Sequence, residues 1–186
     1  MSFVFQTPRF IIRRLEATDR EDMFKMDNDP EVHRYLGNTP VQTIEETDAI
    51  IRSILDQYDR LGVGRMAIID KTTHAFVGWT GLKKLEEPYN NQVGVYDLGY
   101  RLLQEYWGKG VATETALGTI YYGFNTLNLE KITAMADCDN LGSNHVLTKA
   151  GMHFVETFML DNVLHNWYEL TRKDYLEQQS SGKDIV

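Results

Sequence analysis

The chain has 186 residues, of which 42% are hydrophobic and 25% charged, and this composition is typical of a globular domain with a substantial core. A formal net charge of −8 argues against nucleic-acid partners, which need a basic surface, and no apolar run approaches the roughly 20 residues that cross a bilayer. The single cysteine, Cys138, and a start that lacks the features of a secretory signal indicate a cytoplasmic protein with no membrane partner.

The first half of the chain predicts one strand, three helices and two further strands. Thr18 and the acidic residues after it start a helix near residue 19, and Pro30 starts a short second helix. Apolar residues at helical spacing, closed by Gly62, predict a long third helix. The remaining expected ranges are 9–15 for the first strand, 44–61 for the long helix, and 65–70 and 75–85 for the later strands.

The second half alternates strands and helices, and no change in composition marks a linker. We therefore expect one domain over residues 1–177 and a polar tail over 178–186. The fold class is α+β, with a mixed central sheet of six to seven strands flanked by helices. The expected strands are 92–103, 131–137, 153–160 and 166–172, and the expected helices are 111–127 and 143–151.

A glycine loop lies between the strand 92–103 and the helix 111–127, with Gly108 and Gly110 on either side of Lys109. The first amides of a helix lack partners within the helix and lie at the positive end of its dipole, so they stabilise an anion. The spacing matches neither the Walker loop nor the dinucleotide fingerprint. Taken alone, an ordinary glycine turn into a helix explains the loop as well.

Three stretches together resemble the GNAT superfamily of N-acetyltransferases, and in particular its RimJ/RimL-type branch, which acetylates protein N-terminal amines. They are RFIIRRLEATDREDMFKMDNDPEVHRYLG, YDLGYRLLQEYWGKGVATETALGTIYYGF and CDNLGSNHVLTKAGM, and the likeness covers nearly all of residues 8–172. The resemblance implies the GNAT fold and an enzyme that uses acetyl-coenzyme A as a co-substrate. The five histidines lack metal-ligand spacing, so we expect no metal site.

The resemblance also implies the coenzyme contacts. The backbone amides of the family's loop, R/Q-x-x-G-x-G/A, hold the pyrophosphate, and Trp107 stands here where the family usually has Arg or Gln. In the GNAT fold the strand before the loop splays from its neighbour, and its free backbone groups pair with the pantetheine arm. The residues expected to bind the coenzyme are Leu102, Leu103, Trp107, Gly108, Lys109, Gly110, Val111, Ala112, Asn140 and Asn144.

Asp97 is the first candidate catalytic residue, because carboxylates are disfavoured in the middle of a strand. Acetyl transfer to an amine requires the loss of an ammonium proton and favours a proton donor to the leaving thiolate. Asp97 resembles the acidic residue of the branch's E-I-G-Y motif, which lies near the acceptor amine. It is therefore a candidate base or ammonium-binding group, and a paired or rim-exposed strand carboxylate is the alternative.

Ser143 is the second candidate, because Asn140, Ser143 and Asn144 match the branch's N-x-x-S-N pattern. In the branch the asparagine contacts the coenzyme arm, and the serine is placed to protonate the leaving thiolate. Asn140 suits the N-cap of the following helix equally well. Leu147 occupies the position where many GNAT enzymes place a tyrosine acid, so Ser143 is the expected donor.

We expect an N-acetyltransferase that moves the acetyl group directly to a primary amine in a ternary complex. The acceptor could be a protein N-terminal amine or a small amine, and residues 25–45 and 155–166 should shape its site. A non-catalytic coenzyme A-binding module with the GNAT fold is the alternative. A third option is an acidic partner that tethers ribosomal proteins. The oligomeric state stays open, and a homodimer is one option.

Overall fold

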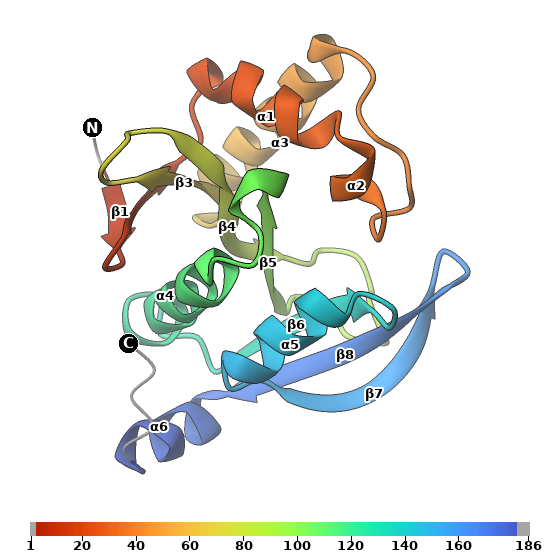
Figure 1. Cartoon of the computed structure of the whole chain (residues 1–186). Coiled ribbons are helices and arrows are strands. Elements are labelled where there is room, and N and C mark those ends of the chain that lie inside the picture. The colour runs from red at the N-terminus through yellow and green to blue at the C-terminus, as the bar shows by residue number, and fades with distance from the viewer. Residues whose placement is uncertain (1–2, 182–186) are drawn as a thin grey trace.

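The computed structural model describes residues 3–181, which form one eight-stranded sheet in the order β1-β2-β3-β4-β5-β6-β8-β7 (Figure 1). All neighbouring pairs are antiparallel except β5 and β6, which are parallel. The strands are β1 (Phe3–Gln6), β2 (Phe10–Arg14), β3 (Arg65–Asp70), β4 (Phe76–Lys84), β5 (Tyr96–Leu102), β6 (Lys131–Asp137), β7 (His153–Leu160) and β8 (Val163–Thr171).

The α+β class is confirmed, but the sheet has eight strands rather than six to seven. The strand not predicted is β1, whose four residues are too few for a periodic pattern and become a strand by pairing with β2. The strand expected from residue 92 begins only at Tyr96. Asn90, Asn91 and Gly94 before it have positive φ, which breaks extended backbone.

Helices cover both faces of this sheet (Figure 1). Arg101 of β5 contacts Asp27 of α1, whereas Leu98 of β5 packs in the same core cluster as the apolar residues of α4. Because side chains alternate along a strand, α1 and α4 lie on opposite faces. The helices are α1 (Arg20–Asp27), α2 (Pro30–His33), α3 (Ile44–Leu61), α4 (Val111–Asn125), α5 (Leu141–Lys149) and α6 (Arg172–Ser180), with short 3₁₀ turns η1 (Ala17–Asp19) and η2 (Gln104–Tyr106).

The first residues of the expected polar tail, 178–180, are the end of α6, which continues to Ser180. Thr171 and Asp174 form a capping box that starts this helix. Gln178 then donates to the carbonyl of Gly151 at 2.9 Å, which ties the helix to the end of α5. Residues 182–186 of the expected tail lie outside the described part of the chain.

The parallel pair β5 and β6 is joined over only two residues. Tyr96 pairs with Ile132 and Asp97 with Thr133, and no further pair joins these strands within residues 3–181. Beyond Asp97, β5 continues paired with β4 alone as far as Leu102, while β6 turns away (Figure 1). The predicted splay is therefore present, and it opens toward the loop that precedes α4.

Candidate active site

The glycine loop has a backbone that favours glycine at both positions. The φ angles of Gly108 and Gly110 are 69° and 75°, which is the left-handed region. A Cβ added to Gly108 would have no atom within 4 Å, so the loop faces open space there. The local turn accounts for the two glycines, and the open space leaves room for a ligand against the backbone.

Gly110 is the N-cap of α4, and within residues 3–181 no side chain caps this helix end. The first helical hydrogen bond runs from the Glu114 amide to the Gly110 carbonyl at 3.0 Å. The amides of the first turn are therefore left to donate hydrogen bonds to an anion at the positive end of the helix dipole. A pyrophosphate fits this cradle because the glycines remove side chains from it and the helix offers donors without partners.

The Trp107 side chain turns back toward β5, although 43% of the residue is exposed. Its indole Nε1 donates to the carbonyl of Leu102 at 3.0 Å. This bond ties the loop back to the end of β5. The side chain that replaces the family's usual Arg or Gln thus holds the loop in place rather than offering its N–H to a ligand.

The open edge of β5 differs from the prediction at one of its two residues. The Leu103 amide donates to Val77, and the Leu103 carbonyl accepts from the Tyr106 amide, so the expected free groups at Leu103 are absent from the described chain. Since the backbone N–H and C=O of successive residues point to alternate sides of a strand, those of Tyr100 and Leu102 point toward the splay instead. The Leu102 carbonyl accepts from Trp107, which leaves the Leu102 N–H and the backbone N–H and C=O of Tyr100 on this edge.

Asp97 lies where β5 and β6 part, and 6% of the residue is exposed. Its Oδ2 accepts from Nη2 of Arg65 at 2.6 Å, and Nη1 of Arg65 donates to the Asp97 carbonyl at 2.8 Å. Its Oδ1 is buried and has no hydrogen-bond partner among residues 3–181. Burial raises the pKa of Asp97, and the Arg65 guanidinium opposes that rise.

Arg65 belongs to a cluster of side chains that extends from β3 to α1 and also includes Trp79, Arg101 and Asp27. Arg65 and Arg101 each lie 5.2 Å from the centre of the Trp79 ring. Arg101 donates to Oδ1 of the fully buried Asp27 at 2.7 Å. The ion pair between Arg101 and Asp27 therefore joins α1 to the strand that carries Asp97.

Ser143 of α5 is joined to β5 through Tyr100. The Tyr100 hydroxyl lies 2.9 Å from Ser143 Oγ and 3.1 Å from the Ser143 carbonyl. Burial raises the pKa of Tyr100 well above its ordinary value, so the phenol keeps its proton and can donate it in a hydrogen bond. This contact spans the opening beside β5, and no sequence pattern signals it.

The two asparagines of the N-x-x-S-N pattern have structural partners. Asn140 is the N-cap of α5, and its Oδ1 accepts from the Ser143 amide at 3.0 Å. Asn144 donates to the carbonyls of Asp137 and Asn140 and accepts from Asn166 and Tyr168, which uses the full capacity of a side-chain amide. The Asn144 side chain therefore has no spare hydrogen-bonding group for a ligand, and the predicted coenzyme contacts of Asn140 and Asn144 stay predictions.

The acetyltransferase (GNAT) domain family matches residues 9–153, which is most of the chain. The chain belongs to the GNAT acetyltransferase family. The uncharacterized N-acetyltransferase p20 of Bacillus licheniformis is 31% identical over 141 residues, which are 76% of this chain and 77% of that protein. The spermidine N(1)-acetyltransferase of Escherichia coli K12 is 28% identical over 158 residues, which are 84% and 80% of the two chains.

Solved structures agree with the GNAT fold. A GNAT-family acetyltransferase from Bacillus anthracis has a TM-score of 0.77 at 24% identity and covers 92% of this chain and 99% of its own. The Vibrio cholerae spermidine N-acetyltransferase in complex with CoA and spermine has a TM-score of 0.74 at 18% identity, with 90% and 98% covered. The expected GNAT fold and acetyl-CoA-dependent acetyltransferase are confirmed.

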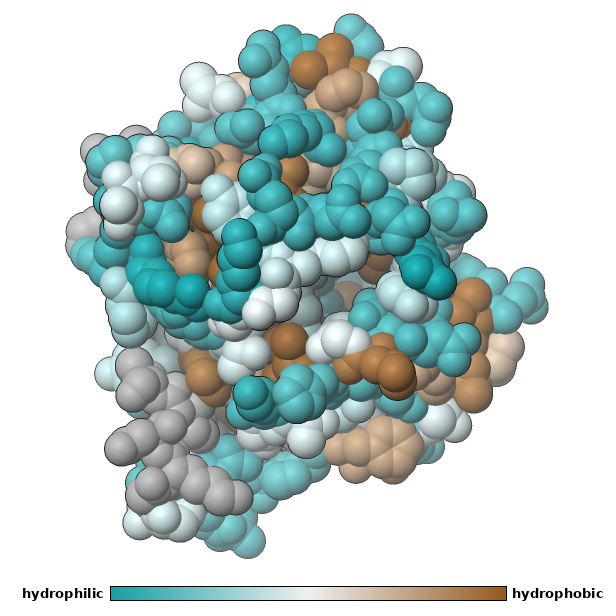
Figure 2. Space-filling view, in the orientation of Figure 1, coloured by the Kyte–Doolittle hydropathy of each residue, from teal (hydrophilic) through white to brown (hydrophobic). Residues whose placement is uncertain are grey.

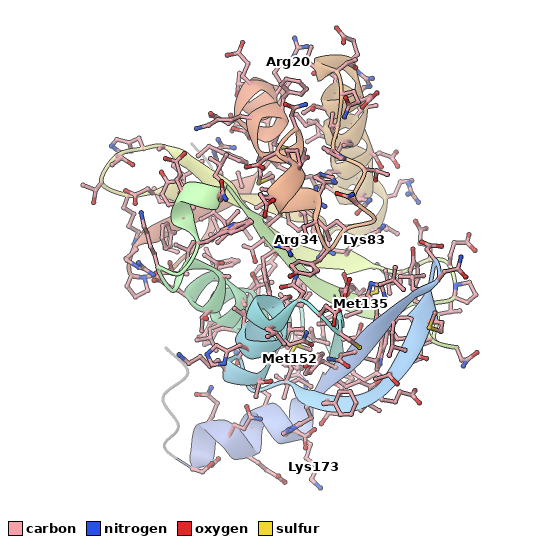
Figure 3. The ribbon with its side chains drawn as sticks, turned by 45° about the vertical axis from the view of Figure 1, so that its right-hand side comes forward. Arg20, Arg34, Lys83, Met135, Met152 and Lys173 are labelled. Carbon is pink, nitrogen blue, oxygen red and sulfur yellow. The ribbon has the colours of Figure 1, made fainter. Side chains whose placement is uncertain are left out.

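The two segments expected to shape the acceptor site of this GNAT enzyme belong to different parts of the fold. Residues 25–45 form the end of α1, α2 and the segment before α3, and residues 155–166 form most of the β7–β8 hairpin. The surface is hollowed between the α1–α2 side and α5 (Figure 2). Arg34, Lys83 and Met135 lie between α2 and the hairpin (Figure 3).

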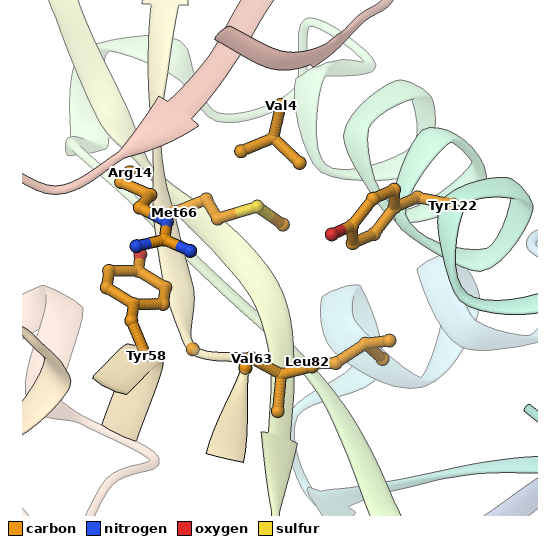
Figure 4. A pocket seen from close by; sticks show the side chains of 9 residues that line it. Val4, Arg14, Tyr58, Val63, Met66, Leu82 and Tyr122 are labelled. Carbon is orange, nitrogen blue, oxygen red and sulfur yellow. The ribbon is translucent and has the colours of Figure 1, made fainter. Parts of the chain in front are cut away.

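A second hollow of about 60 Å³ lies away from these GNAT site residues, between β3 and α4 (Figure 4). Its walls include Tyr58, Met66, Leu82 and Tyr122, and it contains none of the predicted site residues. This volume has room for a few water molecules and none for a coenzyme. Residues 3–181 contain no group of three or more His, Cys, Asp or Glu side chains placed to hold a metal ion, and none of their helices is long and apolar enough to cross a membrane.

Proposed function

We propose that this enzyme transfers the acetyl group of acetyl-CoA to a primary amine by direct attack in a ternary complex. The observation that carries the proposal is the unpartnered Oδ1 of Asp97, buried at the point where β5 and β6 part. A buried carboxylate oxygen without a donor suits a ligand that brings N–H groups and positive charge. An ammonium is such a ligand, and the thioester would lie beside it along the open edge of β5.

In the proposed reaction Asp97 binds the ammonium and accepts its proton, directly or through water. The amine nitrogen attacks the thioester carbonyl, the C–N bond forms, the nitrogen loses its second proton to solvent, and the C–S bond breaks. Ser143 donates its hydroxyl proton to the departing thiolate and is reprotonated from solvent. The net products are the acetylated amine, coenzyme A and one released proton.

The acceptor class rests on charge and on the relatives. The net charge of −8 favours cationic substrates, and two of the similar proteins are named spermidine acetyltransferases. We propose a small polyamine as the first acceptor, while the resemblance to the RimJ/RimL branch makes a protein N-terminal amine the second. Turnover with acetyl-CoA and either spermidine or a short peptide with a free α-amine would separate the two.

That assay also tests the non-catalytic alternative. A non-catalytic coenzyme A-binding module would bind acetyl-CoA, as calorimetry can detect. It would release no free thiol with either spermidine or the peptide. Acetylation of spermidine but not of the peptide supports the polyamine proposal. Acetylation of the peptide alone contradicts it and supports the RimJ/RimL-like interpretation.

Replacing Ser143 by Ala is expected to lower the turnover number by about 10²-fold, the lower end of acid–base catalysis, because a thiolate is a weakly basic leaving group. The dissociation constant of acetyl-CoA should change little, since the proton donor matters most as charge develops on sulfur. Steady-state kinetics and calorimetry measure the two quantities. Thr148→Ala, on the exposed side of α5, is the matched control and should leave both unchanged.

A variant of Tyr100 provides a second test of the role of Ser143. Its hydroxyl lies 2.9 Å from Ser143 Oγ and can hold that hydroxyl in place. Tyr100→Phe should therefore reduce turnover in the wild-type background and have little effect in the Ser143→Ala background. Equal losses of turnover and coenzyme affinity in Ser143→Ala would reassign Ser143 to plain coenzyme binding.

A further inference from the structure

The turn between β1 and β2 is fastened to the start of α4, more than one hundred residues later. Thr7 Oγ1 and the Arg9 amide both donate to Oε1 of Glu114, at 2.7 and 2.9 Å. Arg9 Nε donates to Glu114 Oε2 at 2.6 Å. Burial works against the charged form, yet these hydrogen bonds hold the pKa of Glu114 below its usual range. Glu114 is thus an ionised anchor in the first turn of α4.

The Arg9 side chain also contacts the glycine loop. Its Nη1 donates to the carbonyl of Lys109 at 3.0 Å, and its Nη2 lies 3.6 Å from the position of a Cβ on Gly110. The planar fork of the guanidinium therefore joins the helix anchor and the loop in one rigid contact. No sequence pattern connects Arg9 with this loop.

The contact fixes the direction of one amide in the loop. In a planar trans peptide the carbonyl oxygen and the amide hydrogen point in opposite directions. The Lys109 carbonyl points at Arg9, so the Gly110 N–H points away from Arg9. Arg9 lies behind the loop, on the side opposite to this donor.

We propose that Arg9, held by Glu114, is a positioning residue that fixes the Lys109–Gly110 peptide with its N–H toward the pyrophosphate of acetyl-CoA. The proposal rests on the coenzyme site proposed at this loop. Arg9 is not assigned a direct contact with phosphate, because Glu114 neutralises its charge at 2.6 Å. Its effect is to orient the donor before the ligand arrives, which removes an ordering cost from binding.

The experiment compares three ligands that differ in their phosphates: coenzyme A, 3′-dephospho-coenzyme A and pantetheine. Calorimetry gives the dissociation constants for the wild type, Arg9→Ala and the charge-conserving Arg9→Lys. Arg9→Ala should weaken both coenzyme A and its dephospho form about 3- to 10-fold, the worth of one oriented hydrogen bond, and leave pantetheine unchanged. Arg9→Lys should resemble Arg9→Ala, because an ammonium cannot fork between Glu114 and Lys109.

Arg52→Ala, an exposed arginine on α3, is the matched control and should bind all three ligands like the wild type. Unchanged coenzyme A affinity in both Arg9 variants would overturn the proposal. A loss confined to coenzyme A, with none for the dephospho form, would instead place Arg9 on the 3′-phosphate and also overturn it. A loss for pantetheine as well would mean general damage to the fold and would equally overturn a role confined to the pyrophosphate. A wild type that binds neither nucleotide ligand would refute the coenzyme site itself, which is a separate failure.

Discussion

Replacing Asp97 by Asn is expected to lower the turnover number on the order of 10²–10⁴-fold, the usual worth of general acid–base catalysis. The change keeps the size of the side chain and an oxygen that can accept from Arg65. It removes the negative charge that would bind an ammonium and the basicity that would take its proton. The dissociation constant of acetyl-CoA should be nearly unchanged, because the loop before α4 uses other residues.

The pH dependence of this variant is the more specific test. A base must be unprotonated, so the rate should fall as the pH drops through the pKa of Asp97. Burial raises that pKa, and the acidic limb should therefore lie above the ordinary carboxyl value of 3.8. In Asp97→Asn this limb should move or disappear, whereas the exposed carboxylate variant Asp56→Asn on α3 should keep it.

Asp97→Asn also leaves the Arg65 guanidinium without its carboxylate partner. This change could destabilise the fold, since a buried charge without its counterion is costly. The melting temperature and acetyl-CoA binding of Asp97→Asn show whether the protein is folded under assay conditions. A folded Asp97→Asn variant with near-native turnover and an unchanged acidic limb would make Asp97 a structural partner of Arg65. The amine would then reach the thioester already deprotonated or lose its proton to water.

Replacing Gly108 by Asp is expected to abolish coenzyme binding. Acetyl-CoA at about a hundredfold excess over its dissociation constant should stabilise the wild type by about 2.7 kcal/mol, and this shift should vanish in the variant. A carboxylate at position 108 would enter the open space beside the loop and repel the pyrophosphate. A substitution at Gly110 would be a less direct test, because a Cβ there would lie 3.6 Å from Nη2 of Arg9 and would disturb that side chain as well.

Gly108→Asn is the matched control for this prediction. Asparagine has nearly the same size as aspartate and tolerates positive φ, so it reproduces the backbone strain without the charge. Thermal unfolding with and without acetyl-CoA measures the shift in all three proteins. A normal shift in Gly108→Asp would mean that the pyrophosphate does not lie beside Gly108, and equal losses in both variants would assign the effect to the backbone.

The sequence alone determined the elements whose signals are local. The long helix α3 begins after Thr43, whose side chain accepts from the Glu46 amide, and ends at Gly62 with φ at 71°. Capping and glycine conformation need only neighbouring residues, so this helix could be predicted to within a residue. The same holds for the loop before α4. The capping box at Thr171 was an available local signal for α6 that the prediction did not use.

The tertiary structure decided which groups of the candidate site are free and which are occupied. Sequence patterns selected Asp97, Ser143 and Asn144 alike, but only the fold leaves Oδ1 of Asp97 open while it saturates Asn144. The partners Arg65 and Tyr100 reach these residues across 32 and 43 positions. Such contacts depend on strand register and on the splay of β5 from β6, and a single sequence holds no local signal for either.

The same distinction applies to the glycine loop. Its two glycines could be read from the chain because positive φ is a property of the residue itself. The proposed direction of the Gly110 amide depends on Arg9, which lies one hundred positions before Lys109 and is brought to it by the pairing of β1 and β2 within the sheet. Local chemistry therefore specified where an anion could bind, and packing between distant segments decided how the donors are aimed.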